Sequence, residues 1–339
     1  MLVASQMMLA SRTAVRLLSM SITRQLDQAD PHQLHLVRST GGPCQEELCQ
    51  LGEFDGPRGI APLPGGGACV VDGLNDRVQL LDAEGDAVGT IEGLSCPTGV
   101  AVHGDRLYIS ESTGAHRVTC RRLSDGALIG SVGGLGSGDG ELHGPQCVAV
   151  AGEQLLVAEW GNSRVSVFDR DTMAFVRHIG QTLDDNGDPE GGDAPGQLDE
   201  PSDLAVSGDE LFVADTWNHR ICVFGLTDGA FRRCFGRRGA GRGEFTYPTG
   251  IACADGRVYT TERMGGDANR RVQELSLEGA PLQELLPSHI GRRVARRGGQ
   301  LHGICVDGDR VWVTDSGMHM VHLLTTAEDA YAPPALQVG

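Results

Sequence analysis

Residues 201–224 read PSDLAVSGDELFVADTWNHRICVF, and this stretch decides the fold. Three apolar runs, at 204–206, 211–214 and 221–224, are separated by polar and glycine-containing turns, and a fourth run follows at 231–235. Short apolar runs between turn residues are typical of antiparallel β-strands joined by tight hairpins. The stretch therefore predicts a unit of four short strands.

This unit recurs six times along the chain, so the repeat is considered before any residue is given a chemical role. Each copy has an anchor near the start of its first strand, two residues after a proline in five copies: Gly59, Gly99, Cys147, Asp203, Gly250 and Gly303. An acidic residue closes the second strand of each copy: Asp72, Glu111, Glu159, Asp215, Glu262 and Asp315. The acid lies 12 residues after the anchor in five copies and 13 in the first, whereas successive copies are 39 to 56 residues apart. Constant hairpins joined by variable loops predict an all-β fold, a six-bladed β-propeller of four-stranded antiparallel blades.

The two ends of the repeat predict how the ring closes. The last copy supplies three strands and ends near Leu324, while residues 34–38 precede the first anchor as an outermost strand does in the other copies. We expect this N-terminal strand to pair with the last blade, because pairing removes an open sheet edge. The expected organisation is an N-terminal tail at 1–31, the propeller at 33–325 and a C-terminal tail at 326–339.

The repeat resembles the NHL-repeat family over residues 33–325. The shared pattern is a Gly-rich loop, Pro-x-Gly-Ile/Val-Ala-Val, an apolar strand ending in Asp or Glu, and then Asn-x-Arg-Val/Ile. Three copies match the last element closely: Asn75-Asp76-Arg77-Val78, Asn162-Ser163-Arg164-Val165 and Asn218-His219-Arg220-Ile221. The other three depart from it: His116-Arg117, Asn269-Arg270-Arg271, and Met318-His319-Met320 without an Arg. The resemblance implies a propeller, and the family includes RNA binders, ubiquitin-ligase substrate modules, scaffolds and a metal-dependent lyase, so it does not assign a function.

The composition describes an acidic chain with a globular core. The 339 residues carry 28 basic and 45 acidic side chains, for a formal net charge of −17, and 40% of residues are hydrophobic. These proportions exclude disorder throughout the chain. Every basic residue is Arg, which excludes Schiff-base chemistry and a Walker-type phosphate-binding Lys.

The N-terminus and the cysteines bear on the compartment. No acidic residue precedes Asp27, and the segment before it contains several Arg, Ser and Met, as in an organellar transit peptide or a cytosolic tail. We expect an intracellular, cytoplasmic protein, with a mitochondrial or plastid location through residues 1–31 as the alternative. Five of the ten cysteines fall in apolar strands: Cys69, Cys147, Cys222, Cys253 and Cys305. We expect these to be reduced core thiols rather than disulfides or zinc ligands.

The candidate ligand site is the mouth of the central channel. Loops that enter the innermost strands open on one face of a propeller, so the residue before each anchor is expected to ring the channel mouth. These residues are Arg58, Thr98, Gln146, Ser202, Thr249 and His302. The family's lyase holds zinc through a His before Gly in alternate blades, and His302 fits that pattern, whereas Thr98 and Ser202 do not. A nearby His143 does not complete the set of three ligands that catalytic zinc requires, so we predict neither a metal nor a catalytic residue.

The repeated acids are expected to be structural, pairing with the Arg a few residues later across each hairpin. The acidic loop 184–193 lacks the spacing of a calcium-binding EF-hand and is expected to be solvated.

A basic sector lies before and after blade five: Arg232, Arg233, Arg237, Arg238, Arg242, Arg292, Arg293, Arg296 and Arg297. With the acidic loop, this sector predicts either a plain solvated surface or a polarised docking face.

The sequence favours a non-enzymatic interaction or scaffold propeller that binds a protein or an acidic or phosphorylated peptide on its channel-mouth face. The chain lacks the clustered zinc ligands of a RING finger, so a role as a substrate-recognition partner in ubiquitination would require a separate ligase. The alternative is a propeller enzyme, a metal-dependent lyase or a lactone hydrolase, that uses the channel mouth. RNA binding through the basic sector is a third possibility, which the net charge and the 15 aromatic residues disfavour. We expect a monomer without a cofactor or a membrane segment.

Overall fold

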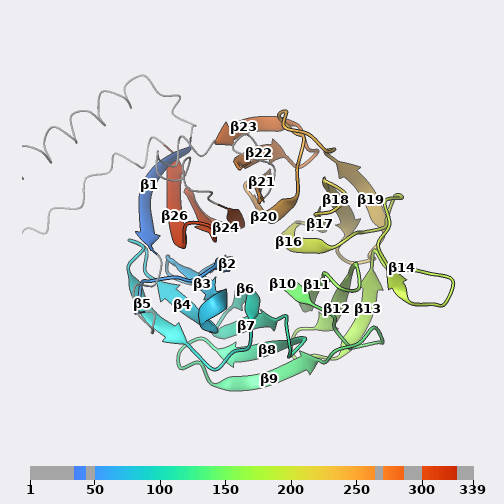
Figure 1. The fold of residues 1–339 in the computed structure, drawn as a ribbon, viewed down its shortest axis with the longest axis horizontal. Coiled ribbons are helices and arrows are strands. Elements are labelled where there is room, and N and C mark those ends of the chain that lie inside the picture. The colour runs from blue at the N-terminus through green and yellow to red at the C-terminus, as the bar shows by residue number, and fades with distance from the viewer. Residues whose placement is uncertain (1–33, 43–49, 264–269, 286–299, 327–339) are drawn as a thin grey trace, which may run out of the picture. The chain divides into compact units, whose positions relative to one another are not determined.

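A computed structural model describes residues 34–42, 50–263, 270–285 and 300–326. Residues 36–324 form one compact unit, in which six four-stranded antiparallel sheets are arranged as blades around a central channel (Figure 1). A single turn of 3₁₀ helix, η1 (Gly73–Asn75), occurs among the described residues, and none of their helices is long and apolar enough to cross a membrane. The predicted six-bladed propeller is therefore confirmed.

Blades one to five each run from the innermost to the outermost strand in chain order. Blade one contains β2 (Pro57–Pro62), β3 (Ala68–Asp72), β4 (Arg77–Leu81) and β5 (Ala87–Ile91). Blade two contains β6 (Pro97–His103), β7 (Arg106–Glu111), β8 (Arg117–Arg122) and β9 (Leu128–Gly133). Blade three contains β10 (Pro145–Ala151), β11 (Gln154–Glu159), β12 (Arg164–Asp169) and β13 (Phe175–Ile179). A two-stranded hairpin, β14 (Thr182–Leu183) and β15 (Pro189–Glu190), separates blades three and four.

The second half of the ring repeats this pattern. Blade four contains β16 (Pro201–Ser207), β17 (Glu210–Asp215), β18 (Arg220–Gly225) and β19 (Phe231–Phe235). Blade five contains β20 (Pro248–Ala254), β21 (Arg257–Glu262), β22 (Val272–Ser276) and β23 (Pro281–Leu285). Blade six contains β24 (Leu301–Asp307), β25 (Arg310–Asp315), β26 (Met320–Thr326) and, from the other end of the chain, β1 (Leu34–Gly41).

The hydrophobic core lies between neighbouring blades. Leu156 and Val165 of blade three pack with Leu211 and Val213 of blade four, and equivalent clusters join the other described blade interfaces. Neighbouring blades cover both faces of the central strands, so β3 is buried at every residue. This packing explains why the second strands are nearly continuous apolar runs rather than alternating ones.

The N-terminal strand closes the ring as predicted. Strand β1 lies beside β26 as the outermost strand of blade six. The Ser39 hydroxyl is 2.8 Å from Nδ1 of His322 on β26, and the Thr40 hydroxyl donates to the carbonyl of Gly85 in blade one. Arg38 forms an ion pair with Asp86. Strand β1 therefore contacts both the last blade and the first.

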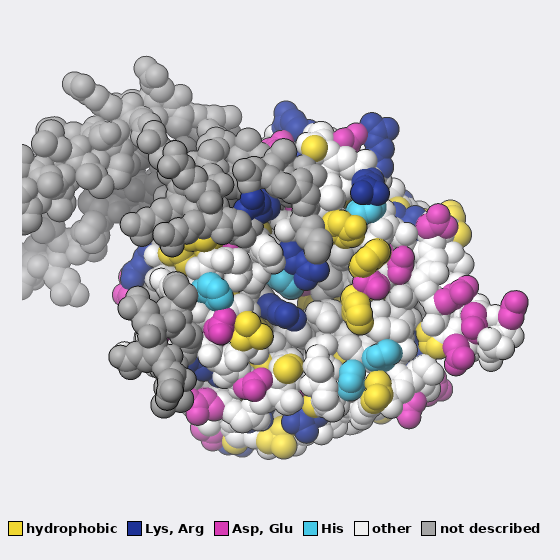
Figure 2. Space-filling view, in the orientation of Figure 1, with side chains coloured by type: hydrophobic (Ala, Val, Ile, Leu, Met, Phe, Trp, Pro, Cys, Tyr) yellow, Lys and Arg dark blue, Asp and Glu magenta, His cyan; other side chains and the backbone are white. Residues whose placement is uncertain are grey.

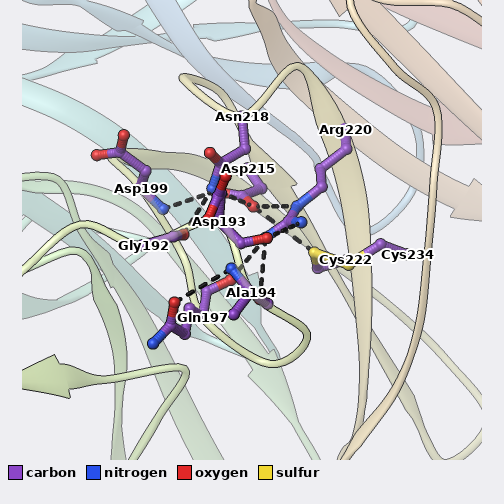
Figure 3. Close-up of a disulfide and its surroundings, with 10 residues drawn as sticks. All are labelled: Gly192, Asp193, Ala194, Gln197, Asp199, Asp215, Asn218, Arg220, Cys222 and Cys234. Atoms are coloured by element: carbon purple, nitrogen blue, oxygen red, sulfur yellow. Dashed lines mark hydrogen bonds and ion pairs between the residues drawn. A yellow bond between two sulfur atoms is a disulfide. The ribbon is translucent and has the colours of Figure 1, made fainter.

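One expectation about the cysteines is wrong. Cys222 and Cys234 form a disulfide between β18 and β19 (Figure 3). The strand register places the two residues directly opposite each other, with their Cα atoms 4.2 Å apart, which is the close spacing of facing residues in an antiparallel pair. Cys69, Cys147, Cys253 and Cys305 are free thiols, as expected. Cys234 lies in the fourth run at 231–235, and its pairing with Cys222 depends on the register of the two strands, which the sequence pattern did not give.

Candidate functional site

The repeated acids hold the blades together. All six are fully buried: Asp72, Glu111, Glu159, Asp215, Glu262 and Asp315. In five blades the carboxylate pairs with an arginine of the next strand at 2.7 to 2.9 Å, as Glu159 does with Arg164. In most blades the acid also accepts a backbone N–H from the loop that enters the blade, as Asp215 does from Asp199 (Figure 3). The contacts repeat from blade to blade, which is the pattern of a structural group.

The sixth blade departs from this pattern because it has no arginine at the corresponding position. Asp315 instead lies 3.6 Å from Nε2 of His322, which is also buried. The neutral partner of the acid in the other blades occupies the same register position as His322, for example Gln79 in blade one and Ser166 in blade three. His322 therefore occupies the position of the neutral partner and also contacts the closing strand.

The six residues predicted to ring the channel mouth share one backbone feature. In each blade the pairing of the first two strands shifts register at this position, as between Pro201 and Asp203 around Ser202. A β-bulge turns a side chain out of the ladder. The residue that follows is Gly in four blades because the next blade's backbone approaches closely: a Cβ at Gly250 would lie 2.2 Å from the carbonyl oxygen of His302.

The mouth is a cavity of about 280 Å³, and a second cavity of about 290 Å³ forms the channel beneath it. Five predicted residues line the mouth: Arg58, Gln146, Ser202, Thr249 and His302. Thr98 lines the channel instead. Figure 2 shows basic, hydrophobic and histidine side chains gathered around the hollow at the centre of this face. The structure thus brings the predicted ring together, and its ligand-binding role stays a prediction.

Several other residues of the mouth were not predicted. They come from the loops that join the second and third strands: Ser112, Thr113, His116, Trp160, Thr216, Trp217 and Arg263. Four of these, including Trp160 and Arg263, directly follow the buried acid of their blade. The offset from the acid was the signal that would have found them, because these loops open on the same face as the anchor loops.

One side of the mouth is basic. Arg58 of blade one, His302 of blade six and Arg263 of blade five line it together. Burial lowers the pKa of Arg58, and repulsion from Arg263 lowers it further. Burial, with the charges of Arg58 and Arg263, lowers the pKa of His302 to about 3, so its imidazole is neutral at physiological pH.

The opposite side combines aromatic rings with one acid. Trp160 and Trp217 are 46% and 52% exposed, although tryptophan usually lies mostly buried. The ring of Trp217 meets the edge of Tyr247 at 5.7 Å between centroids, which helps to fix its orientation. Glu200 lies between these blades with a backbone φ of 48°, and burial raises the pKa of its carboxyl group.

Two imidazoles of the mouth lie close enough to suggest metal binding. The ring centroids of His116 and His143 are 5.6 Å apart, and burial lowers the pKa of His116. Nδ1 of His116 already accepts the backbone N–H of Gly144. Among the described residues no group of three or more His, Cys, Asp and Glu side chains is placed to hold a metal ion.

Asp203 is an acid where most blades have glycine, and it lines the channel below the mouth. Its carboxylate accepts the backbone N–H of Ile251 in blade five, and the Cys147 thiol of blade three lies against it. Burial raises the pKa of Asp203 to about 6, only partly offset by these hydrogen bonds. Asp203 thus links three blades, but its buried environment disfavours the charged form of the carboxyl group.

This pKa predicts a pH dependence of stability. The folded chain binds a proton on Asp203 more tightly than the unfolded chain, so protonation stabilises the fold at low pH and the gain is lost as the pH rises through about 6. Relative to Asp203→Asn, the wild type should lose about 1 kcal/mol of unfolding free energy between about pH 5 and pH 7.5. Urea denaturation of both proteins at the two pH values measures this loss. A constant difference between the two proteins would contradict the prediction.

The basic sector is less uniform than predicted. Arg232 and Arg233 on β19 lie toward the face opposite the mouth, where Arg232 pairs with Asp228 of the β18–β19 turn and Arg233 pairs with Glu210. Two members of the sector, Arg237 and Arg238, lie on loops that open on the mouth face and are exposed. Arg292, Arg293, Arg296 and Arg297 fall outside the described residues.

Two other arginines of this sector already have partners within the chain. Arg237 pairs with Glu244 at 2.8 Å, and Arg242 donates to the carbonyl oxygen of Leu282. Arg238 makes no side-chain hydrogen bond or ion pair within the described ranges. In the acidic loop, Asp184 accepts the backbone N–H groups of Asn186 and Asp188, an arrangement of a self-contained turn.

Comparison with known proteins supports the repeat assignment. A family model described as NHL repeat matches residues 198–224, most of blade four. The RING finger protein nhl-1 of Caenorhabditis elegans is 40% identical over 68 residues, which cover 20% of this chain. The matched segment spans 7% of the length of that curated relative.

Solved structures share the fold at low sequence identity. A protein of unknown function from Bacteroides thetaiotaomicron superposes with a TM-score of 0.60 at 16% identity, over 86% of this chain and 75% of that one. Streptogramin B lyase superposes with a TM-score of 0.55 at 13% identity, over 80% of this chain and 94% of that one. Kuenenia stuttgartiensis hydrazine synthase superposes with a TM-score of 0.54 at 15% identity, over 84% of this chain and 80% of that one. The repeat match and the six observed blades together describe the chain as a six-bladed β-propeller whose fourth blade matches an NHL repeat.

Proposed function

We propose that this chain is a non-enzymatic interaction propeller that holds a protein or an acidic peptide on its channel-mouth face. The NHL propeller fold supports a general scaffold role. One observation carries the finer proposal: the mouth presents side chains that the repeat does not require. Trp160 and Trp217 are exposed there, and they stand at different offsets from the acids of blades three and four. Exposed aromatic side chains around a concave site are typical of protein recognition.

The hydroxyl groups of the ring support binding rather than catalysis. Thr98 donates to the carbonyl oxygen of Pro145, and Ser202 donates to that of Thr249, so both hydroxyls connect neighbouring blades. They occupy the alternate-blade positions where the family's lyase has imidazoles. Streptogramin B lyase shares the fold at 13% identity, which bears on architecture and not on chemistry.

Affinity capture from native lysate tests the proposal. The Trp160→Ser/Trp217→Ser variant should lose most of the protein recovered by the wild type, because aromatic anchors dominate binding energy at interfaces. The matched control is Leu128→Ser/Val176→Ser, which removes two exposed apolar side chains from outer strands. Equal recovery by the wild type and the tryptophan variant would overturn the proposal.

The basic sector provides a second arm of the same experiment. The variant with Gln at Arg237, Arg238, Arg292 and Arg293 should recover less partner at low salt, because exposed charges act within a Debye length of about 8 Å at physiological ionic strength. Its melting temperature should hardly change, since surface ion pairs contribute little to folding. Unchanged recovery would mean that this sector is merely solvated.

A role beside a ubiquitin ligase is part of the proposal. Its support is the 68-residue likeness to a RING finger protein. A RING-containing protein should then be recovered with the wild type in the same capture experiment. Recovery of partners without any ligase component would remove ubiquitination from the proposal and leave the scaffold role in place.

A further inference from the structure

Two arginines of the mouth differ from nearly all others in the chain. Among the arginines in the described ranges, the guanidinium groups of Arg58, Arg238 and Arg263 make no hydrogen bond or ion pair, whereas the others contact a carboxylate, a carbonyl oxygen or another side chain. Arg238 is exposed to solvent, where an unpaired charge costs little. Arg58 and Arg263 instead line one cavity.

The unpaired guanidinium groups of Arg58 and Arg263 destabilise the fold when no ligand is bound. Arg58 is partly withdrawn from water, and repulsion from Arg263 adds to the cost of its charge. Removing a cation from water destabilises a fold unless an anion compensates for it. No acid in the described part forms an ion pair with either guanidinium, although the charge of Arg263 acts on Glu200 across the mouth. The two cations are therefore placed to meet an anion from another molecule.

Glu200, on another wall of the cavity, indicates a second chemical group that the ligand would carry. Glu200 lies on the wall formed by the loops of blades three and four. The Trp160 side chain hydrogen-bonds the carboxyl group of Glu200, whereas the Oε2 atom of that group is buried without a hydrogen-bond partner among the described residues. The left-handed backbone φ of Glu200 is a feature of the repeat, because the pre-proline residues of the other four blades with this proline share it: Gly56, Cys96, Gly144 and Tyr247. A buried acceptor atom without a partner, at the wall of a cavity, indicates a ligand that donates a hydrogen bond.

We propose that the channel mouth binds an acidic peptide, with a carboxylate of the peptide on Arg58 and Arg263 and a backbone N–H directed to Glu200. This inference rests on the proposed function and names the ligand chemistry of the same face. The fork of an Arg guanidinium matches the two oxygens of a carboxylate. Trp160, on the same side as Glu200, offers an apolar surface for the neighbouring peptide residue.

The cavity fits a peptide better than a nucleic acid. Glu200 would repel a phosphate chain that crosses the mouth, whereas a peptide supplies an N–H for its unpartnered Oε2 atom. The mouth has a volume of about 280 Å³, which suits one chain end or one protruding side chain. A terminal carboxylate and an acidic side chain present the same group, so the test separates these two sources.

Binding of the purified full chain to a peptide array tests the inference. The array holds random dodecapeptides with a free C-terminus, the same peptides amidated, and a set without Asp or Glu. Wild-type protein should select peptides that carry a carboxylate, and the amidated arm should show whether it is terminal or on a side chain. Arg58→Gln/Arg263→Gln should weaken binding of the selected peptides at least about tenfold, because both charge-assisted contacts are lost.

The control variant Arg106→Gln/Arg122→Gln removes the same charge from the opposite face, where each arginine pairs with an exposed aspartate, and should bind as the wild type does. Selected peptides that need no carboxylate, or that bind the mouth variant equally well, would overturn the subsite but leave an interaction role. No peptide binding by the wild type would overturn the subsite, whereas the capture experiment decides the interaction role. Tighter binding of a labelled single-stranded RNA, lost in the same variant, would replace the peptide as occupant.

Discussion

Replacing Arg164 by Ala should lower the free energy of unfolding by about 3–5 kcal/mol, among the largest effects of any single substitution in this chain. Arg164 and Glu159 are both fully buried and form an ion pair at 2.8 Å. The guanidinium also donates to the carbonyl oxygens of Ser137 and Glu141 in the loop that enters the blade. Truncation leaves the buried carboxylate with only the neutral donors His143, Asn162 and Ser166 and without a counter-charge, and it removes this donor from both carbonyl groups. The cost is therefore that of an uncompensated buried charge.

Two further variants make this result specific. Arg164→Lys keeps the charge but not the fork, so the loss should be intermediate. Arg122→Ala breaks an ion pair with Asp125 whose side chains are about half exposed, and should change stability by less than about 1 kcal/mol. Denaturant midpoints of the three variants measure the series. Equal midpoints for Arg164→Ala and Arg122→Ala would mean that the buried pair is not a structural element of the blade.

The repeat made the fold predictable from sequence because one spatial requirement occurs in every copy. The anchor at Gly250 allows the backbone of the next blade to approach, and the acid 12 residues later must reach the entry loop of its own blade. These two requirements fix the length of the hairpin between them. Loops outside it carry no such requirement, which is why only the spacing between copies varies.

The site was less predictable, because its residues depend on geometry that the repeat does not encode. The bulge that turns Ser202 into the mouth follows from the register, and the repeat located it. Arg58 has no ion-pair partner because no described acid lies close enough to it in the fold, and a local sequence pattern does not give such distances. The disulfide between Cys222 and Cys234 likewise follows from the pairing of β18 with β19, and the two cysteines are seen to face each other only once the register of these strands is known.

Blade six shows how sequence departures locate special positions. The copy that lacks an arginine is also the copy completed by a strand from the other end of the chain. His322 there lies near both Asp315 and Ser39, so one side chain joins the buried acid to the closing strand. A fourth strand that does not follow its blade in sequence needs side-chain contacts of this kind, because no turn holds it in place.

Removal of β1 should therefore be far more damaging than its length suggests. Deleting residues 1–30 is expected to preserve cooperative unfolding, whereas deleting residues 1–40 should lower the melting midpoint or cause aggregation. The longer deletion removes the contacts of Ser39 with His322 and of Arg38 with Asp86, and it exposes the backbone groups of β26 along an unpaired edge. Such an edge is a template for pairing with another chain.

The comparison of the two deletions separates the effect of losing β1, which closes the ring, from any effect of losing residues 1–30. Thermal unfolding followed by circular dichroism, with light scattering in parallel, measures stability and aggregation for both proteins. A full-length Ser39→Pro variant keeps every residue before β1 but places a proline within the strand, where it cannot donate to a ladder. If this variant behaves as the longer deletion does, pairing of β1 closes the ring, because the two proteins share only the damaged strand. Equal stability of both deletions would show instead that three strands suffice for the last blade.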